Sequence, residues 1–565
     1  MPNSSRFAIF LRVLLLPVGL IAATVAGLGS YFEANDDLAL AWLFSGVTAT
    51  GPVASVPLYF HGYGHALAAA YAALPAVPWF GLLLGLGLSA ATVLVFAVLD
   101  KLLRRWWPGP VVVMLLVVFF GLAWLEHWLW FSYVRVGLLL AGAGVLYAAQ
   151  RPGRRGPLLL GLAALLAAWL MRPSLGVMGL AAAAPGALWL AGSWRRALPT
   201  LAGGALLLAM ATALAAFLQT PEQAHTQARD RYFAQILDFD QLRPQPRTPA
   251  DSLGTEAVNL WMMGDSTLVN EALCRRAYVF NARDFYGREV PAKLRLRAAL
   301  LLRDYFPLLL GLAATALATA RRRPRGEVLF WLVQAAFGGG LIFLAGVLKL
   351  PPRLELPLLI FWLLANAAFV LRPPESDRDI AAAGRSALPI FSAKWKRAGA
   401  VLVLAVLLLY GAKTWHRHQV LSAERRRHEI ALSELRHQGA GAVRILAGTN
   451  DFLKSLSPFR PYSVGPGPVL QLSGWPSHDA SQARLRRALS GTADQTECLR
   501  RLARLPGYSA PPRVLWVLTP ETARWLSRRL ALRGERMLLY PEGPPLAHDT
   551  AISARVYHLQ QWPEH

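Results

Sequence analysis

The feature that most constrains this chain is a series of apolar runs that approach or reach the length needed to cross a lipid bilayer. A transmembrane helix needs roughly 17 to 25 predominantly apolar residues. About eleven such runs precede residue 413, at 7–29, 79–99, 110–125, 134–149, 157–171, 175–192, 198–218, 298–320, 328–348, 354–371 and 397–412. The sequence therefore predicts an all-α polytopic membrane protein with about eleven transmembrane helices.

Composition and charge agree with this class. Hydrophobic residues make up 55% of the 565 residues and charged residues 16%, whereas soluble domains carry about 25% charged residues. The net charge of +25 is concentrated in short basic runs between apolar stretches, namely 101–105, 151–155, 195–196 and 321–325. Cytoplasmic loops of membrane proteins carry such runs. With no basic strip of interleaved aromatic residues, the charge does not indicate nucleic-acid binding.

If the basic runs face the cytoplasm, the N-terminus is cytoplasmic and the C-terminus lies on the opposite, outer side. This orientation leaves two long connections on the outer side, which we call the first loop (30–78) and the long loop (219–297). A short loop from Lys349 to Glu355 lies on the same side. Loops longer than about a dozen residues are usually functional, so we expect the functional site on the outer face.

The chain after residue 412 has a different residue pattern, in which short strand-like and helix-like segments replace the long apolar runs. We divide it into a membrane domain, 1–412, and a small C-terminal α/β domain, 413–565, on the outer side. A polar helix is predicted at 413–437, then strands at 443–446, 468–472, 513–518, 537–540 and 556–559, and helices at 479–489, 495–505 and 520–533. Cys274 in the long loop and Cys498 in this domain either form a disulfide or remain free.

Three carboxylates lie within five residues at the start of the first loop: Glu33, Asp36 and Asp37. Carboxylates at a membrane surface need water, a cation or a proton, so their clustering suggests a functional site. The alternative is a hydrated turn in which Asp36 caps a helix that begins at Leu38.

The rest of the first loop adds two motifs. His61 and His65 are spaced i,i+4, and the segment Pro75-Ala76-Val77-Pro78-Trp79-Phe80-Gly81 opens the second apolar run. Together with Asn35-Asp36-Asp37, these motifs resemble the first loop of the GT-C superfamily of integral-membrane glycosyltransferases, in particular a group of uncharacterised bacterial proteins with an Asn-Asp-Asp turn. The resemblance covers about the first 100 residues.

This resemblance implies a GT-C-like fold and an enzyme of the bacterial cytoplasmic (inner) membrane. Such an enzyme takes a sugar from a polyprenyl-phosphate carrier on the periplasmic face and transfers it to a cell-envelope acceptor, which is a glycan, lipid or protein. The general base of the family maps onto Asp36 or Asp37. The C-terminal domain is then periplasmic.

The leaving phosphate needs cations, which the late short loop supplies. Lys349-Leu350-Pro351-Pro352-Arg353-Leu354-Glu355-Leu356-Pro357 resembles the Arg-Tyr-x-x-Pro element beside the donor phosphate in GT-C enzymes, with Leu354 in place of Tyr. Arginines at helix ends also snorkel to lipid headgroups, which is the alternative for Arg353. The predicted substrate-binding residues are Glu33, His61, His65, Arg135, Arg172, Lys349, Arg353 and Glu355.

No metal or other cofactor is assigned, although His61 and His65 near the carboxylates leave a divalent ion open. Glu126 and His127 lie beside Trp128 and Trp130, which favours an interfacial aromatic belt over a place in the cavity. Two other functions stay open: a transporter or flippase of lipid-linked sugars, which needs ionisable residues within the spans, and a non-catalytic glycan-lipid-binding scaffold.

Overall fold

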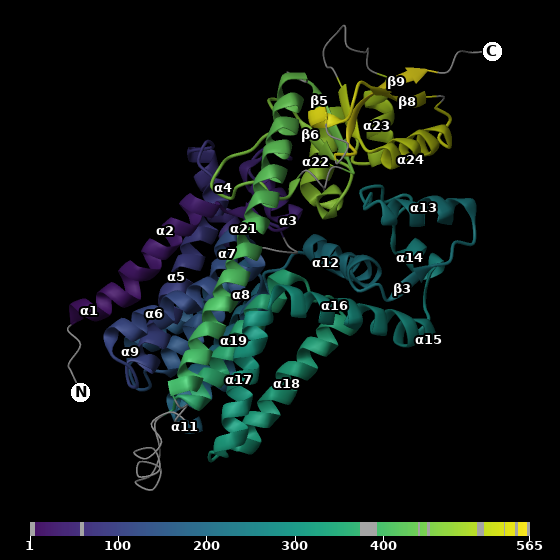
Figure 1. The fold of residues 1–565 in the computed structure, drawn as a ribbon. Helices are drawn as coiled ribbons and strands as arrows, with labels where there is room; N and C mark the ends of the chain where they lie inside the picture. The colour runs from purple at the N-terminus through teal and green to yellow at the C-terminus, as the bar shows by residue number, and fades with distance from the viewer. Residues whose placement is uncertain are drawn as a thin grey trace.

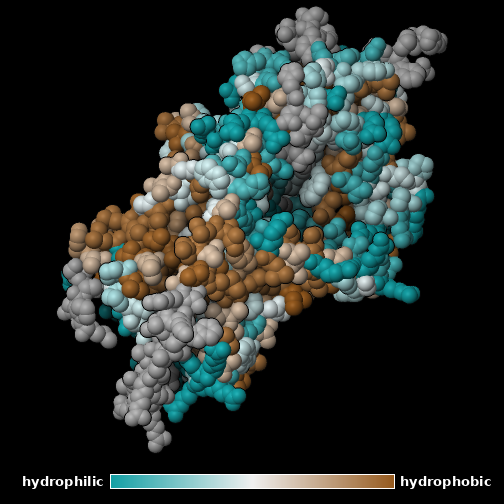
Figure 2. Space-filling view, in the orientation of Figure 1, coloured by the Kyte–Doolittle hydropathy of each residue, from teal (hydrophilic) through white to brown (hydrophobic). Residues whose placement is uncertain are grey.

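The computed structural model describes residues 6–56, 62–372, 393–438, 441–448, 453–504, 514–535, 537–548 and 552–561. Over these residues the protein is mostly helical, with a bundle of long apolar helices and a C-terminal sheet flanked by helices (Figure 1). Figure 2 shows apolar residues gathered over the bundle and hydrophilic residues over the C-terminal part. This division is typical of a membrane domain joined to a water-facing one.

Eight helices within the described ranges are long and apolar enough to cross a membrane. They are Arg6–Leu28 (α1, η1 and α2), Trp79–Leu103 (α5), Gly109–Leu129 (α6, η2 and α7), Pro173–Ala191 (α10), Trp194–Phe217 (α11), Glu327–Gly346 (α18), Pro352–Val370 (α19) and Gly399–Gln438, which is most of α21. A ninth candidate is a pair bent by 90°, Ala282–Asp304 (α15, η4 and α16) and Phe306–Arg322 (α17).

Two further apolar helices, Tyr133–Ala149 (α8) and Arg155–Met171 (α9), are shorter. Ten of the eleven apolar runs predicted from the sequence each lie on one of these helices, whereas the run at 298–320 is divided by the 90° bend at Tyr305. A multi-pass membrane protein is therefore supported, with eight or nine helices of sufficient length. The count of about eleven crossings stays a prediction.

Helix α8 lies at the centre of the bundle, and all but one of its residues are buried. Its glycines permit close packing: a Cβ added at Gly142 would lie 2.2 Å from the ring of Phe361 in α19. On another face, Gly144 meets Gly161 of α9, where an added Cβ would lie 2.6 Å from the Gly144 carbonyl oxygen. Small residues bring membrane helices together in this way. The packing fixes the N-terminal end of α8, where Tyr133 and Arg135 lie.

Two very short strands connect the first loop to the start of α8. Tyr31–Phe32 (β1) pairs in parallel with Trp130–Phe131 (β2), and the Glu33 amide donates to the Phe131 carbonyl oxygen at 2.8 Å. Helix α3 (Asn35–Ser45) follows directly, and α4 (Tyr63–Ala73) packs against it. This register brings the three first-loop carboxylates beside the N-terminus of α8.

The C-terminal region contains one mixed sheet in the order β6-β5-β7-β9-β8. The strands β6, β5 and β7 run parallel, while β9 is antiparallel to both β7 and β8. The elements are β5 (Val443–Ala447), β6 (Val469–Gln471), η6 (Trp475–His478), α22 (Ala480–Ser490), α23 (Gln495–Ala503), β7 (Val514–Leu518), α24 (Pro520–Ala531), β8 (Met537–Glu542), η7 (Leu546–His548) and β9 (Arg555–Gln561). The five strands and three helices predicted from the sequence are confirmed.

The long loop folds against this sheet instead of standing alone. Its elements are α12 (Pro221–Phe233), η3 (Ala234–Asp238), β3 (Leu242–Pro244), α13 (Pro249–Asn259), α14 (Glu271–Ala277) and β4 (Tyr278–Phe280). Buried residues of α13 and α14 share one hydrophobic cluster with strands β5 and β7 and helix α24. Inside the contact, the Trp525 indole donates to the Leu253 carbonyl oxygen at 3.0 Å. Buried Asp265 pairs with Arg529 at 2.8 Å.

The two parts of the molecule are joined by α21 (Ala393–Gln438), a continuous helix of 46 residues. In Figure 1 it runs from the far end of the bundle to the side of the C-terminal sheet. The predicted polar helix at 413–437 is the second half of this helix. The division at residues 412 and 413 therefore falls within a single helix, not in a linker.

Candidate functional site

Glu33 and Arg135 form the innermost pair of the site. The Glu33 Oε2 and Arg135 Nε atoms are 2.5 Å apart, and the Arg135 side chain is fully buried. The Nδ1 atom of His127 lies 3.3 Å from Arg135 Nη1. Burying a guanidinium is costly unless a carboxylate accompanies it. Glu33 therefore holds Arg135 in place at the start of α8.

Asp37 has a different environment, because it forms no ion pair with any cation in the part of the chain that the structure describes. Its Oδ1 atom accepts a hydrogen bond from the Tyr133 amide at 2.9 Å, one of the amides that the first turn of α8 leaves without a helical partner. The side chain is fully buried, and Oδ2 has no partner among the described residues. Burial raises the pKa of Asp37 to about 8, despite the lowering effect of the Tyr133 amide.

Asp36 is the most accessible of the three carboxylates. Its Oδ2 atom lies 3.3 Å from Arg353 Nη2, and its Oδ1 atom accepts from the Trp475 indole at 3.2 Å. About a fifth of each side chain of the Asp36–Arg353 pair is exposed. The expectation that Asp36 caps a helix is wrong, because α3 begins at Asn35 and Asp36 lies inside its first turn.

Arg172 is the last residue of the site. It separates α9 from α10, and its Nη1 atom lies 3.4 Å from the hydroxyl oxygen of Tyr133. The site thus gathers side chains from four places in the sequence: the first loop, the start of α8, the α9–α10 junction and the start of α19. It contains Glu33, Asp36, Asp37, Tyr133, Arg135, Arg172 and Arg353, which we call the carboxylate–arginine cluster.

Among the described residues, no hydrogen bond or ion pair joins the other predicted residues to this cluster. Lys349 pairs with Asp238 at 2.6 Å and is exposed. His65 is exposed on α4, and His61 lies outside the described residues. Glu355 is buried and lies 3.9 Å from Arg297. The structure thus joins four of the eight predicted substrate-binding residues around the two predicted catalytic residues: Glu33, Arg135, Arg172 and Arg353. It does not join His65, Lys349 or Glu355 to them.

Glu126 and His127 do not form an interfacial belt. Both are buried, and the Glu126 Oε1 atom accepts from Lys413 and from Arg417, each at 2.8 Å. Both cations belong to α21, and Arg417 also approaches Asp304 at 3.6 Å. The belt interpretation was wrong because local aromatic neighbours do not reveal that a distant helix brings two cations to the same place.

The described residues contain no candidate metal site. In that part of the chain, no three His, Cys, Asp or Glu side chains come together in a way that could hold an ion. The first-loop carboxylates face arginines or a backbone amide instead. Cys274 and Cys498 are both free and buried within the same cluster, so the disulfide alternative is wrong.

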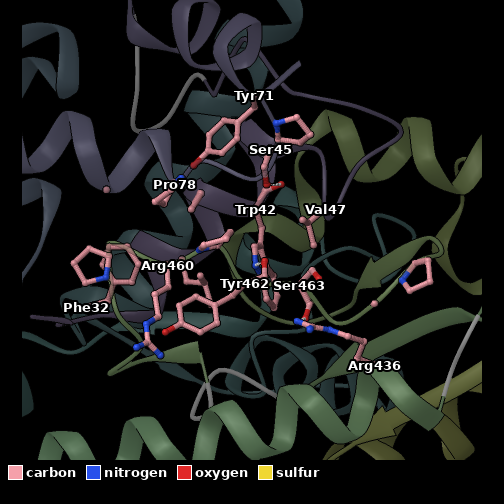
Figure 3. A pocket seen from close by; sticks show the side chains of 18 residues that line it. Phe32, Trp42, Ser45, Val47, Tyr71, Pro78, Arg436, Arg460, Tyr462 and Ser463 are labelled. Atoms are coloured by element: carbon pink, nitrogen blue, oxygen red, sulfur yellow. Dashed lines mark hydrogen bonds between the residues drawn. The ribbon is translucent and has the colours of Figure 1, made fainter. Parts of the chain in front are cut away.

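A pocket with a volume of about 620 Å³ lies on the other side of α3 (Figure 3). Leu38, Ala41, Trp42 and Ser45 line it at helical spacing, so Asp36 lies on the opposite face of the helix. Its far wall comes from residues 458–466 and from Arg436. The Trp42 side chain is 1% exposed and its indole donates to the Tyr462 carbonyl oxygen at 2.9 Å. The Trp42–Tyr462 hydrogen bond therefore joins the first loop to the C-terminal region beside this pocket.

Sequence reasoning missed Trp475, which lies 439 positions from Asp36. Its immediate sequence, Gly474-Trp475-Pro476, marks a turn with a rigid aromatic side chain, but nothing local indicates its partner. Scanned against models of known protein families the chain matches none, and a search of curated proteins finds no similar sequence.

Proposed function

We propose that this chain is a GT-C-like glycosyltransferase of a bacterial cytoplasmic membrane. It transfers a sugar from a polyprenyl-phosphate carrier to a cell-envelope acceptor on the periplasmic face. The observation that carries the proposal is the pairing of Asp36 with Arg353. The two residues were predicted separately, as base and as phosphate-binding cation, and they lie 317 positions apart in the sequence but 3.3 Å apart in the structure.

The chemistry follows from the charges of the cluster. Asp36 accepts the proton of the acceptor hydroxyl, whose oxygen attacks the anomeric carbon of the sugar. The bond between that carbon and the phosphate oxygen breaks, and the carrier phosphate departs with both bonding electrons. Arg353 and Arg172 stabilise the departing phosphate, since guanidinium groups bind phosphate oxygens in pairs. A single displacement inverts the anomeric configuration.

In this reaction Asp36 and Arg353 each leave the other for a substrate group, and the geometry of their pair suits that exchange of partners. Its contact is longer than the Glu33–Arg135 contact, and both side chains reach solvent. Asp37 contributes differently: with a pKa of about 8 it is largely protonated at neutral pH and adds little negative charge near the phosphate. Glu33 neutralises Arg135. Arg172 and Arg353 therefore remain beside Asp36.

One observation favours a second candidate, a flippase of lipid-linked sugars. Glu126 lies within the candidate span Gly109–Leu129, and Lys413 and Arg417 lie within Gly399–Gln438. Buried ionisable residues in spans are typical of transport pathways. Their shared carboxylate, Glu126, is only 1% exposed, however, whereas the Asp36 carboxylate of the first loop is 18% exposed. We therefore favour the transferase.

The test uses a deletion strain of the source bacterium, complemented with wild type or with Asp36→Asn at equal membrane abundance. Mass spectrometry measures the sugars of the surface glycans and of the polyprenyl phosphates. The transferase predicts that one sugar disappears from the glycan and that its lipid-linked donor accumulates. Wild type reverses both changes, whereas Asp36→Asn reverses neither.

The location of the accumulated donor separates the two candidates. For a transferase, the donor accumulates on the outer leaflet and reacts with a membrane-impermeant oxidant such as periodate in intact spheroplasts. For a flippase, it accumulates on the inner leaflet and is protected. Full complementation by Asp36→Asn contradicts a catalytic role for Asp36.

A further inference from the structure

The C-terminal region reaches into the carboxylate–arginine cluster through one side chain. Trp475 opens η6, and its Nε1–H group donates to Asp36 Oδ1 at 3.2 Å while Arg353 faces Oδ2 at 3.3 Å. Trp475 is 8% exposed, so the indole is a wall of the cluster and not a solvent-exposed neighbour. Both oxygens of Asp36 are therefore held, each from a different part of the molecule.

The turn that carries Trp475 is braced from the long loop. Gly474 has a φ of 79°, which favours glycine, and its amide donates to the Trp261 carbonyl oxygen at 2.8 Å. At the other end of η6, His478 Nε2 lies 2.6 Å from Asp230 Oδ1. The His478 carbonyl oxygen accepts from Arg229 at 2.9 Å. These contacts fix the turn on both sides of the indole.

We propose that Trp475 is a positioning residue for Asp36, so that the long loop and the C-terminal sheet together complete the site of the membrane domain. The indole N–H holds one carboxylate oxygen and so sets the side-chain rotamer of Asp36. A base must lie within hydrogen-bond reach of the proton it accepts, and small displacements of a reacting group reduce the rate severely. This inference rests on the proposed function for its consequence, but the contact itself is testable without any activity.

The first measurement is made on the full-length protein in detergent, with its tryptophans labelled with ¹⁵N at the indole. Trp475→Phe removes one indole N–H resonance and so identifies the resonance of Trp475. In Asp36→Asn this resonance moves upfield, because a neutral amide accepts a weaker hydrogen bond than a carboxylate. The resonance of Trp525, whose indole donates to the Leu253 carbonyl oxygen, stays in place. An unmoved Trp475 resonance overturns the proposal.

The second measurement is sugar transfer from the lipid-linked sugar that accumulates in the deletion strain. Trp475→Phe keeps a ring in the same place but removes the N–H group. We expect kcat to fall about tenfold, the size of one charge-assisted hydrogen bond, while KM for the donor changes less than about twofold. The matched control, Trp525→Phe, loses an indole hydrogen bond of the same region without contact to Asp36, and its kcat stays at the wild-type value.

The two measurements fail in different ways. If the Trp475 resonance responds to Asp36→Asn but the wild-type protein transfers no sugar, the contact stands and the proposed function is wrong. If wild type transfers sugar and Trp475→Phe matches it in kcat, the positioning role is wrong and the proposed function stands. If kcat falls equally in Trp475→Phe and Trp525→Phe, Trp475 has only a structural role. That outcome also overturns the proposal.

Discussion

Two ion pairs connect helices at opposite ends of the bundle, and they are built differently. Near the N-terminus, Arg12 Nε and Asp100 Oδ1 are 2.6 Å apart, with 8% and 2% of the side chains exposed. At the first loop, Arg353 and Asp36 are 3.3 Å apart, with 21% and 18% exposed. Helix α5 separates the two places, because Trp79 follows the first loop and Asp100 lies in its last turn.

The exposure of the two pairs separates a structural pair from one whose partners can be replaced. A closed, buried pair cannot change partners without leaving a charge unpaired in a low-dielectric surrounding. A partly exposed pair loses less when a ligand replaces one partner, because water reaches the charge that is left behind. The Arg12–Asp100 pair therefore joins η1 to α5. The proposed function assigns the phosphate and the hydroxyl group to the Asp36–Arg353 pair.

The largest effect is expected from Asp36→Asn. The amide cannot accept a proton, so sugar transfer by purified protein should fall by about 10²- to 10⁴-fold, the contribution of a general base. The melting temperature should fall less than in Asp100→Asn, because the Asp36–Arg353 pair is partly exposed. Wild-type transfer rates in Asp36→Asn would contradict the assignment of Asp36 as the general base.

Asp100→Asn should show the reverse pattern. It leaves Arg12 buried without a carboxylate, so the free energy of unfolding should fall by about 3–5 kcal/mol. Transfer per folded molecule should stay near the wild-type value. Thermal unfolding in detergent and rates normalised to folded protein check this, and a folded Asp100→Asn protein that is inactive contradicts the structural assignment of the pair.

A smaller effect is expected from Arg353→Lys. Lysine keeps the charge but loses the planar, two-pronged contact with phosphate oxygens, so transfer should fall about tenfold. Arg12→Lys is the matched control at the closed pair and should leave transfer unchanged. Comparable losses of transfer in both variants indicate a general loss of structure instead of a lost phosphate contact.

The smallest effect on sugar transfer is expected at Asp37, whose effect on stability depends on pH. Its pKa of about 8 lies above the value of 3.8 for a free side chain, so the folded protein binds a proton that the unfolded chain has released over that interval. Stability from this group is therefore lost as pH rises from about 4 to 8.

Asp37→Asn cannot ionise and escapes this loss. Its melting temperature relative to wild type should increase between pH 5 and pH 8, while its transfer at neutral pH stays within a few-fold of wild type. A difference in melting temperature that is flat over this range contradicts the buried, protonated state of Asp37.

Local features of the structure could be predicted from the sequence. The apolar runs identified the helices of the bundle because hydrophobic length is a local property, and short runs of β-favouring residues identified the five strands of the C-terminal sheet. The first-loop carboxylates and Arg353 were recognised by residue type in a motif. Each of these depends on neighbours within about 20 residues.

Pairings between distant segments could not be predicted. Nothing near Trp475 indicates Asp36, and nothing near Glu126 indicates that α21 supplies Lys413 and Arg417. The shared core of the long loop and the C-terminal sheet is also invisible to periodicity, which reveals an apolar face but not what covers it. Such contacts arise only when the chain is packed.

The most direct test of the account is stoichiometric. Purified protein is mixed with the lipid-linked sugar that accumulates in the deletion strain and with glycan isolated from that strain, and both products are measured by mass spectrometry. The account predicts one free polyprenyl phosphate released for each sugar joined to the glycan, with neither product formed by Asp36→Asn. Sugar transfer at the wild-type rate by Asp36→Asn, or no polyprenyl phosphate released by wild type, contradicts it.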